Sequence, residues 1–168
     1  PISERITAVT SITNEMVDDC PNEEVVVKEF VEWFKDLPMV AHNAKFDTSF
    51  LEMAYKKYNL GEFKNTVIDT LALSRLIDQD QSRHGLSAIT KRYGVEFDES
   101  SHHRADYDAL GTALVFHKMM KKLESINIIK MSDMESLVNK DDIHKFGRSY
   151  HINLLVRNKV GLKNLFKI

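Results

Sequence analysis

The alternation of short apolar runs with longer amphipathic stretches is the feature that most constrains the fold. MVAH (39–42) and NTVIDT (65–70) have the length and composition of buried strands. Apolar residues at helical spacing predict helices over 21–38, 45–60, 71–77, 85–95 and 104–126. Strands that alternate with helices in this way are typical of an α/β layered domain.

Composition excludes several classes of site. The net charge of −2 over 168 residues provides no general attraction to nucleic acid, so any such binding must be local. A single cysteine, Cys20, permits neither an internal disulfide nor a cysteine-based zinc site, and it fits a reducing cytoplasm. No apolar run is long enough to span a membrane, and we expect no membrane partner. The chain starts at Pro1 without Met, and its apolar pattern still runs at Ile168, so we expect a piece of a longer protein.

Two carboxylates lie on the apolar faces of predicted helices. Asp47 precedes Phe50 by three residues and Leu51 by four, which places it on the same inward face of helix 45–60. Asp108 leads a second apolar face, which continues through Thr112, Val115, Met119 and Leu123. A carboxylate on such a face is costly unless it is hydrogen-bonded, paired or bound to a metal. Backbone N–H groups of the first helical turn would satisfy either acid alone, whereas two such acids favour a shared cation.

A histidine precedes the second acid. Five residues separate His103 from Asp108, which within one helix would put the two side chains about 140° apart. His103 must therefore precede the helix if both are to reach one centre, and there it is placed to act as a general base for water. The alternatives are a solvated helix start and a zinc site formed by His102, His103 and His117. The zinc site is the poorer of these, because adjacent histidines rarely converge on one ion.

The stretch AHNAKFD places the end of a predicted strand directly against the start of a helix. Ligand sites in α/β sheets lie at such carboxyl ends of strands. Asn43 is either a turn residue or a donor to a ligand, and Phe46 is either a core residue or a stacking surface for a base.

Three stretches together resemble the DEDDh exonucleases, a family with the ribonuclease H-like fold. HNAKFD contains the family's N-A-x-F-D motif at 43–47, and HRADYDA contains its H-x-x-x-x-D motif at His103 and Asp108. VIDT (67–70) is the third of these stretches, and GLSAITKRYGV (85–95) resembles the family's L-x-x-L-x-x-x-x-G segment, which supports the site. The resemblance covers residues 1–126, with the motifs in the family's order and spacing.

The resemblance implies hydrolysis of the 3′-terminal phosphodiester of DNA with two divalent ions, Mg²⁺ or Mn²⁺. It makes His103 the general base and Asp47 and Asp108 the metal ligands, while Asn43 and Phe46 bind the terminal nucleotide. The family's first motif, D-x-E on an opening strand, supplies two further ligands and does not occur in these 168 residues. DMESL (133–137) contains the D-x-E pattern, but it follows the H-x-x-x-x-D motif, whereas the family's D-x-E motif comes first in the chain. We therefore expect the chain alone to be weakly active or inactive.

The last twenty residues indicate which group within the exonuclease family the chain resembles. SYHINLLVRNKVGLKNLFKI (149–168) is similar to the point where the polymerase-and-histidinol-phosphatase (PHP) domain resumes in PolC-type bacterial DNA polymerase III alpha subunits. We therefore expect an incomplete exonuclease domain over 1–126, a linker over 127–148 and a βα piece of a PHP domain over 149–168. The implied partners are the 3′ end of the primer strand, the remainder of the polymerase chain and a sliding clamp. A DEDDh nuclease that acts on RNA and a non-catalytic DNA-holding module of the polymerase stay open as alternatives.

Overall fold

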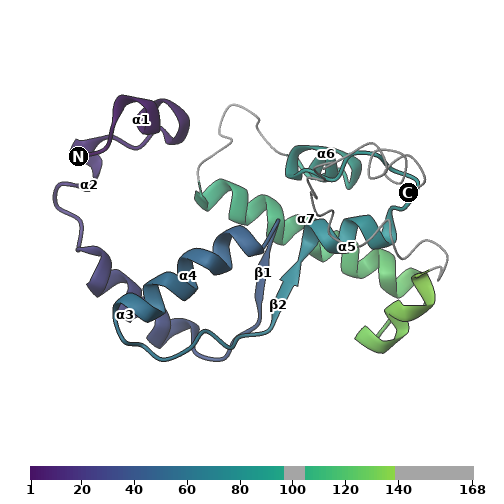
Figure 1. Ribbon diagram of the computed structural model, residues 1–168. Helices are drawn as coiled ribbons and strands as arrows, with labels where there is room; N and C mark the ends of the chain where they lie inside the picture. The colour runs from purple at the N-terminus through teal and green to yellow at the C-terminus, as the bar shows by residue number, and fades with distance from the viewer. Residues whose placement is uncertain (97–104, 139–168) are drawn as a thin grey trace, which may run out of the picture.

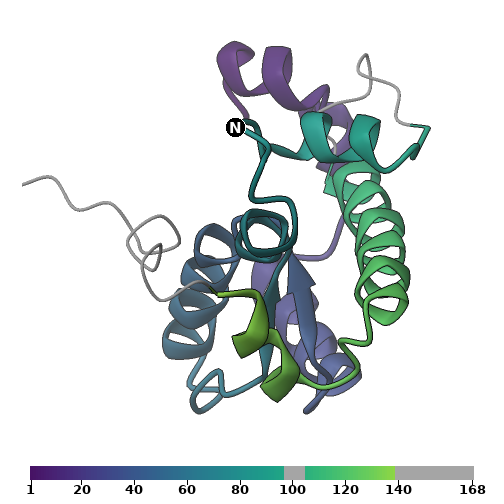
Figure 2. The ribbon, with the colours of Figure 1, turned by 90° about the vertical axis from the view of Figure 1, so that its right-hand side faces the viewer.

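Two short parallel strands lie at the centre of the structure, a computed structural model that describes residues 1–96 and 105–138 (Figure 1). Strand β1 (Met39–Ala41) pairs with β2 (Val67–Asp69), with Val40 opposite Ile68. Helix α4 (Lys45–Lys57) lies on one side of the strands and helix α7 (Ala105–Ser125) on the other (Figure 2). The mixed α/β layering and both predicted strands are confirmed.

Helix α3 (Glu23–Phe34) begins as the sequence predicts and ends earlier. The Asn22 side chain accepts a hydrogen bond from the Val25 N–H at 3.1 Å, which caps the helix. Lys35 adopts a φ of 48°, so the helix ends there, before Pro38. Two shorter helices, α1 (Glu4–Thr10) and α2 (Asn14–Val17), precede α3.

The main apolar core joins three helices. Leu73 of α5 (Thr70–Ile77) and Ile89 of α6 (Leu86–Arg92) pack with buried residues of α7. The predicted inward face of α7 is confirmed, because four of its residues are buried: Thr112, Val115, Met119 and Leu123. Gly94, which follows α6, has a φ of 62°, a left-handed conformation that ends the helix.

The predicted inward face of α4 is partly wrong. Phe50 is 58% exposed, and the buried residues of the helix are Ala54 and Tyr55. The reason is that the described part of the chain provides a sheet of only two strands, which is too narrow to cover the first turns of the helix. The ring of Phe50 instead packs edge-on against Phe46, with the ring centroids 5.1 Å apart.

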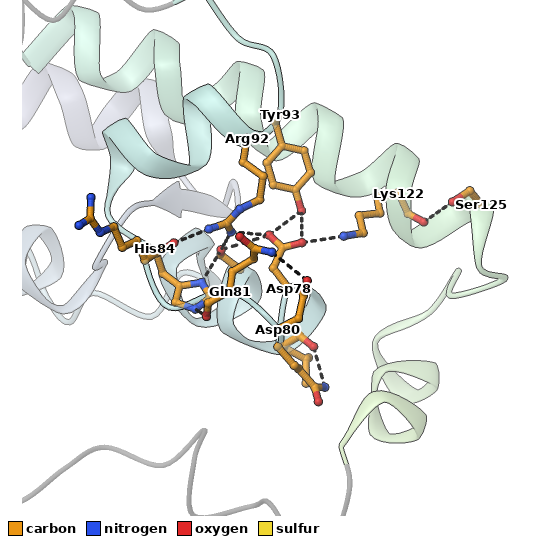
Figure 3. A network of polar contacts seen from close by, with 12 residues as sticks. Asp78, Asp80, Gln81, His84, Arg92, Tyr93, Lys122 and Ser125 are labelled. Carbon is orange, nitrogen blue, oxygen red and sulfur yellow. Dashed lines mark hydrogen bonds and ion pairs between the residues drawn. The ribbon is translucent and has the colours of Figure 1, made fainter.

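A buried carboxylate links α5, α6 and α7. Asp78, which follows α5, is 2% exposed and accepts hydrogen bonds from Arg92 of α6 at 2.8 Å and Lys122 of α7 at 2.6 Å (Figure 3). The Tyr93 hydroxyl lies 3.1 Å from Asp78 Oδ2. Burial alone would raise the pKa of Asp78, but the hydrogen bonds from Lys122 and Arg92 outweigh it and hold the pKa below its usual range. The carboxylate therefore fixes the ends of three helices relative to one another.

The predicted linker is described only in its first part. A 3₁₀ helix, η2 (Met131–Leu137), follows α7. A hydrogen bond from Gln79 Nε2 to the Leu137 carbonyl oxygen at 2.7 Å attaches it to the segment after α5. The βα piece predicted over 149–168 lies outside the described residues. None of the helices within 1–96 and 105–138 has both the length and the apolar composition that crossing a membrane requires.

The packing of α7 predicts that two alanine substitutions on this helix will change the free energy of unfolding by very different amounts. Met119→Ala should lower the free energy of unfolding by about 2 to 5 kcal/mol, because the side chain is fully buried and its removal leaves a cavity. Leu114→Ala, at a position 44% exposed on the same helix, should change it by no more than about 0.5 kcal/mol. Urea-induced unfolding of both variants measures the difference, and equal losses would contradict the described packing of α7.

Candidate active site at the carboxyl edge of the sheet

The carboxyl ends of β1 and β2 are joined by one side chain. Asp69, the last residue of β2, accepts a hydrogen bond from the backbone N–H of Asn43 at 2.9 Å. The same oxygen accepts the backbone N–H of Leu71 at 2.9 Å, which caps α5. Asp69 therefore determines both the start of α5 and the position of the turn after β1.

The turn after β1 presents two of the predicted site residues. Asn43 has a φ of 62°, a left-handed conformation that asparagine tolerates better than most residues. Its carbonyl oxygen accepts the Phe46 N–H at 3.0 Å, and α4 begins within this turn. The side chain of Asn43 is exposed and Phe46 is 64% exposed, so the alternative that Phe46 is a core residue is wrong.

Asp47 lies in the first turn of α4 and is half-buried. Burial raises the pKa of its carboxyl group, and the negative charge of Asp69 raises it further, while a backbone hydrogen bond opposes the rise. The negative charge of Asp47 is therefore unfavourable here in the absence of a cation. This electrostatic environment differs from that of Asp78, where two cations stabilise the ionised form.

Asp108 lies in the first turn of α7, and its Oδ1 atom is buried. Helix α7 contacts β1, and α4 lies on the other side of the strands, so Asp108 and Asp47 lie on helices on opposite sides of the strands (Figure 2). His102 and His103 lie outside the described residues, so the structure does not test the roles predicted for them. His117, the third histidine of the alternative zinc site, is exposed on α7.

The carboxylates fit a divalent cation by their chemistry, although the described residues do not complete a site. Carboxylate oxygens are the ligands that Mg²⁺ and Mn²⁺ prefer. A nearby cation would stabilise the ionised form of Asp47, which burial and Asp69 disfavour. Within 1–96 and 105–138, however, no three His, Cys, Asp or Glu side chains are grouped closely enough to hold a metal ion.

Three residues at this edge received no role from the sequence. Thr70 is fully buried and donates to the Ala41 carbonyl oxygen at 3.2 Å, and its hydroxyl lies 3.0 Å from His42 Nδ1. Burial lowers the pKa of His42, against an opposing effect of Asp69. The sequence carries a signal for Asp69 alone, because an acid directly before TLALS has the pattern of a helix N-cap.

Comparison with known proteins agrees with this arrangement. A family model for exonucleases, RNase_T, matches residues 1–116, and the chain belongs to that exonuclease family. The chain is also 42% identical over 167 residues to DNA polymerase III PolC-type of Staphylococcus aureus, with the same identity in strains MW2 and USA300. The match covers 99% of this chain and 12% of those relatives, so the chain spans about one eighth of their length.

The environment of Asp47 predicts a dependence of stability on pH. A carboxyl group whose pKa is raised in the folded state stabilises the fold at low pH, and this contribution is lost as the pH rises through the folded-state pKa. Without divalent cations, Asp47→Asn should therefore have a higher free energy of unfolding than the wild type at pH 7. The advantage should shrink below the ordinary aspartate pKa of about 3.9. Glu52→Gln, at an exposed position of α4, controls for the lost charge, and a less stable Asp47→Asn at pH 7 would contradict the electrostatics described.

Proposed function

We propose that this chain supplies a 3′–5′ exonuclease that removes mispaired nucleotides from the primer 3′ end within a PolC-type DNA polymerase III. One observation carries the proposal. Asn43, Phe46 and Asp47, which have the pattern of the family's second motif, directly follow a strand whose neighbour ends in the carboxylate of Asp69. The polymerase relatives support DNA as the substrate.

In the proposed reaction, Asp47 and Asp108 would hold Mg²⁺ or Mn²⁺, together with carboxylates from outside these 168 residues. Such ions would lower the pKa of the attacking water and stabilise the leaving 3′-oxygen. His103 accepts the proton from the water as its oxygen bonds to phosphorus and the bond to the 3′-oxygen breaks. The raised pKa of Asp47 supports the ligand role, because a cation would favour its ionised form.

Asn43 and Phe46 bind the terminal nucleotide in this proposal. The exposed ring of Phe46 offers a face on which a base can stack, and base stacking on an aromatic ring is worth about 1 to 3 kcal/mol. The amide of Asn43 is exposed in the same turn and can donate to the nucleotide.

We extend the proposal to the architecture of the longer protein. Within the described residues only one edge of β1 is paired. The helices beside the strands expose apolar side chains at Phe50, Met53 and Leu110. Further strands that carry the D-x-E motif would pair with β1 and cover such side chains. The remaining partners that we propose are a PHP domain, which resumes at residues 149–168, and a sliding clamp bound by the whole polymerase in the cytoplasm.

Separate alanine substitutions of His103 and His102 test whether His103 is the general base. In the full-length protein, His103→Ala should lower the rate of removal of a mispaired 3′ nucleotide by about 100-fold or more, since a general base contributes about that much. His102→Ala should keep the wild-type rate and serves as the matched control. Both variants should retain the thermal unfolding transition of the wild type. If His103→Ala removes the nucleotide at the wild-type rate, His103 is not the base.

The substrate and the need for the missing motif are tested in one assay. Residues 1–168 alone should hydrolyse single-stranded DNA far more slowly than the full-length protein, because two carboxylates neutralise less cation charge than four. The full-length protein should degrade single-stranded DNA in preference to RNA of the same sequence. A preference for RNA would support the RNA nuclease alternative. Absence of degradation, with no effect of Asp47→Asn or Asp108→Asn on Mn²⁺ binding, would support the DNA-holding module.

A further inference from the structure

One buried hydroxyl group joins the start of α5 to the end of β1. Thr70, the first residue of α5, is fully buried, and its Oγ1 donates to the Ala41 carbonyl oxygen at 3.2 Å. The same oxygen lies 3.0 Å from Nδ1 of His42. A hydroxyl group has one proton to donate and two lone pairs with which to accept. Both contacts are therefore made at once when the proton is directed to Ala41 and a protonated Nδ1 of His42 donates to Thr70.

The contacts of Thr70 continue the one that Asp69 makes. Asp69 Oδ1 accepts the backbone N–H of Asn43 at 2.9 Å, so three successive residues, 41 to 43, are hydrogen-bonded to two side chains at the start of α5. The Asn43 carbonyl oxygen in turn accepts the Phe46 N–H at 3.0 Å, in the turn from which α4 begins. The position of α4 relative to the sheet edge therefore depends on these contacts.

Strand pairing alone does not extend to this turn. The last residue pair of β1 and β2 is Ala41 with Asp69, and the residues at 42 and 43 lie beyond it. Asn43 also has a φ of 62°, a left-handed conformation that costs free energy and persists only where surrounding contacts hold it. The side chains of Asp69 and Thr70 supply such contacts, and that of Thr70 is buried, where water cannot compete for its hydrogen bonds.

We propose that Thr70 is a positioning residue for the exonuclease site: its hydroxyl holds the end of β1 and thereby fixes the turn that presents Asn43 and Asp47. The inference rests on the proposed function, since that turn is the proposed substrate and metal site. Thr70 itself is buried and acts through Ala41 and His42. Displacement of reacting groups by about 1 Å costs on the order of 100-fold in rate, so a loosened turn should affect catalysis more than substrate binding.

Thr70→Val tests the proposal in the full-length protein. Valine has nearly the shape of threonine but can neither donate nor accept a hydrogen bond, so the variant removes both contacts without leaving a cavity. Thr70→Ala is a second variant without the hydroxyl, for use if valine is not accommodated, and Thr70→Ser restores the hydroxyl. Thr90→Val is the matched control, because Thr90 is also buried and its hydroxyl donates, at 3.0 Å, to carbonyl oxygens of its own helix, Leu86 and Ser87.

One measurement does not depend on activity. Hydrogen–deuterium exchange followed by mass spectrometry reports on peptide 41–48, which contains the turn and the first residues of α4. Thr70→Val and Thr70→Ala should each raise the exchange of this peptide several-fold, and Thr70→Ser should return it to the wild-type rate. Thr90→Val should leave it unchanged. Unchanged exchange at 41–48 in both variants without the hydroxyl would overturn the proposal.

The kinetic measurement separates positioning from general stability. Thr70→Val should lower kcat for removal of a 3′ nucleotide by about tenfold, with KM changed by less than about twofold. Thr70→Ser should recover most of the lost kcat, and Thr90→Val should keep both constants. Faster exchange at 41–48 with unchanged kcat, or an equal loss of kcat in Thr90→Val, would overturn the positioning role. If the wild type degrades no nucleic acid, the proposed function fails, and the exchange data still decide whether Thr70 holds the turn.

Discussion

The parallel pairing of β1 with β2 is the constraint on which the rest of the structure depends. Three residue pairs bring the ends of two strands together, although Ala41 and its partner Asp69 are 28 positions apart in the sequence. At that edge the Asp69 carboxylate accepts N–H groups from Asn43 and Leu71, so one side chain fixes the turn before α4 and the start of α5. Every described residue of the proposed site other than Asp108 belongs to that turn or to the first turn of α4.

Two carboxylates within one small domain have opposite electrostatic environments. Asp78 receives Arg92 and Lys122, which lower its pKa despite burial, so it is stable as a permanent anion that joins three helices. Asp47 has burial and the charge of Asp69 acting against its ionised form, and its pKa is raised. A carboxylate whose charge is unfavourable in the protein alone is a candidate for binding a cation, and it lies at the end of β1 where ligands of α/β sheets bind.

Periodicity predicted both strands and the helices α3 to α7, because these elements depend on local spacing and caps such as Asn22. It also predicted the buried face of α7, which packs against α5 and α6 within the chain. The prediction that Phe50 faces inward was wrong. Burial on α4 depends on the width of the sheet, and the spacing of apolar residues within a helix contains no information about that width. The roles of Asp78 and His42 depend on partners distant in sequence, namely Lys122 for Asp78 and Thr70 for His42, and no local pattern indicates them.

The central claim is that Asp47 and Asp108 bind one group of divalent ions at the carboxyl edge of the sheet. Its most direct test is the anomalous scattering of Mn²⁺ in crystals of the full-length protein grown with the ion. The account predicts a manganese peak about 2 Å from a carboxylate oxygen of Asp47 or Asp108, with the other carboxylate bound to the same ion or to a second ion beside it. Manganese bound elsewhere, with both carboxylates away from it, would contradict the account.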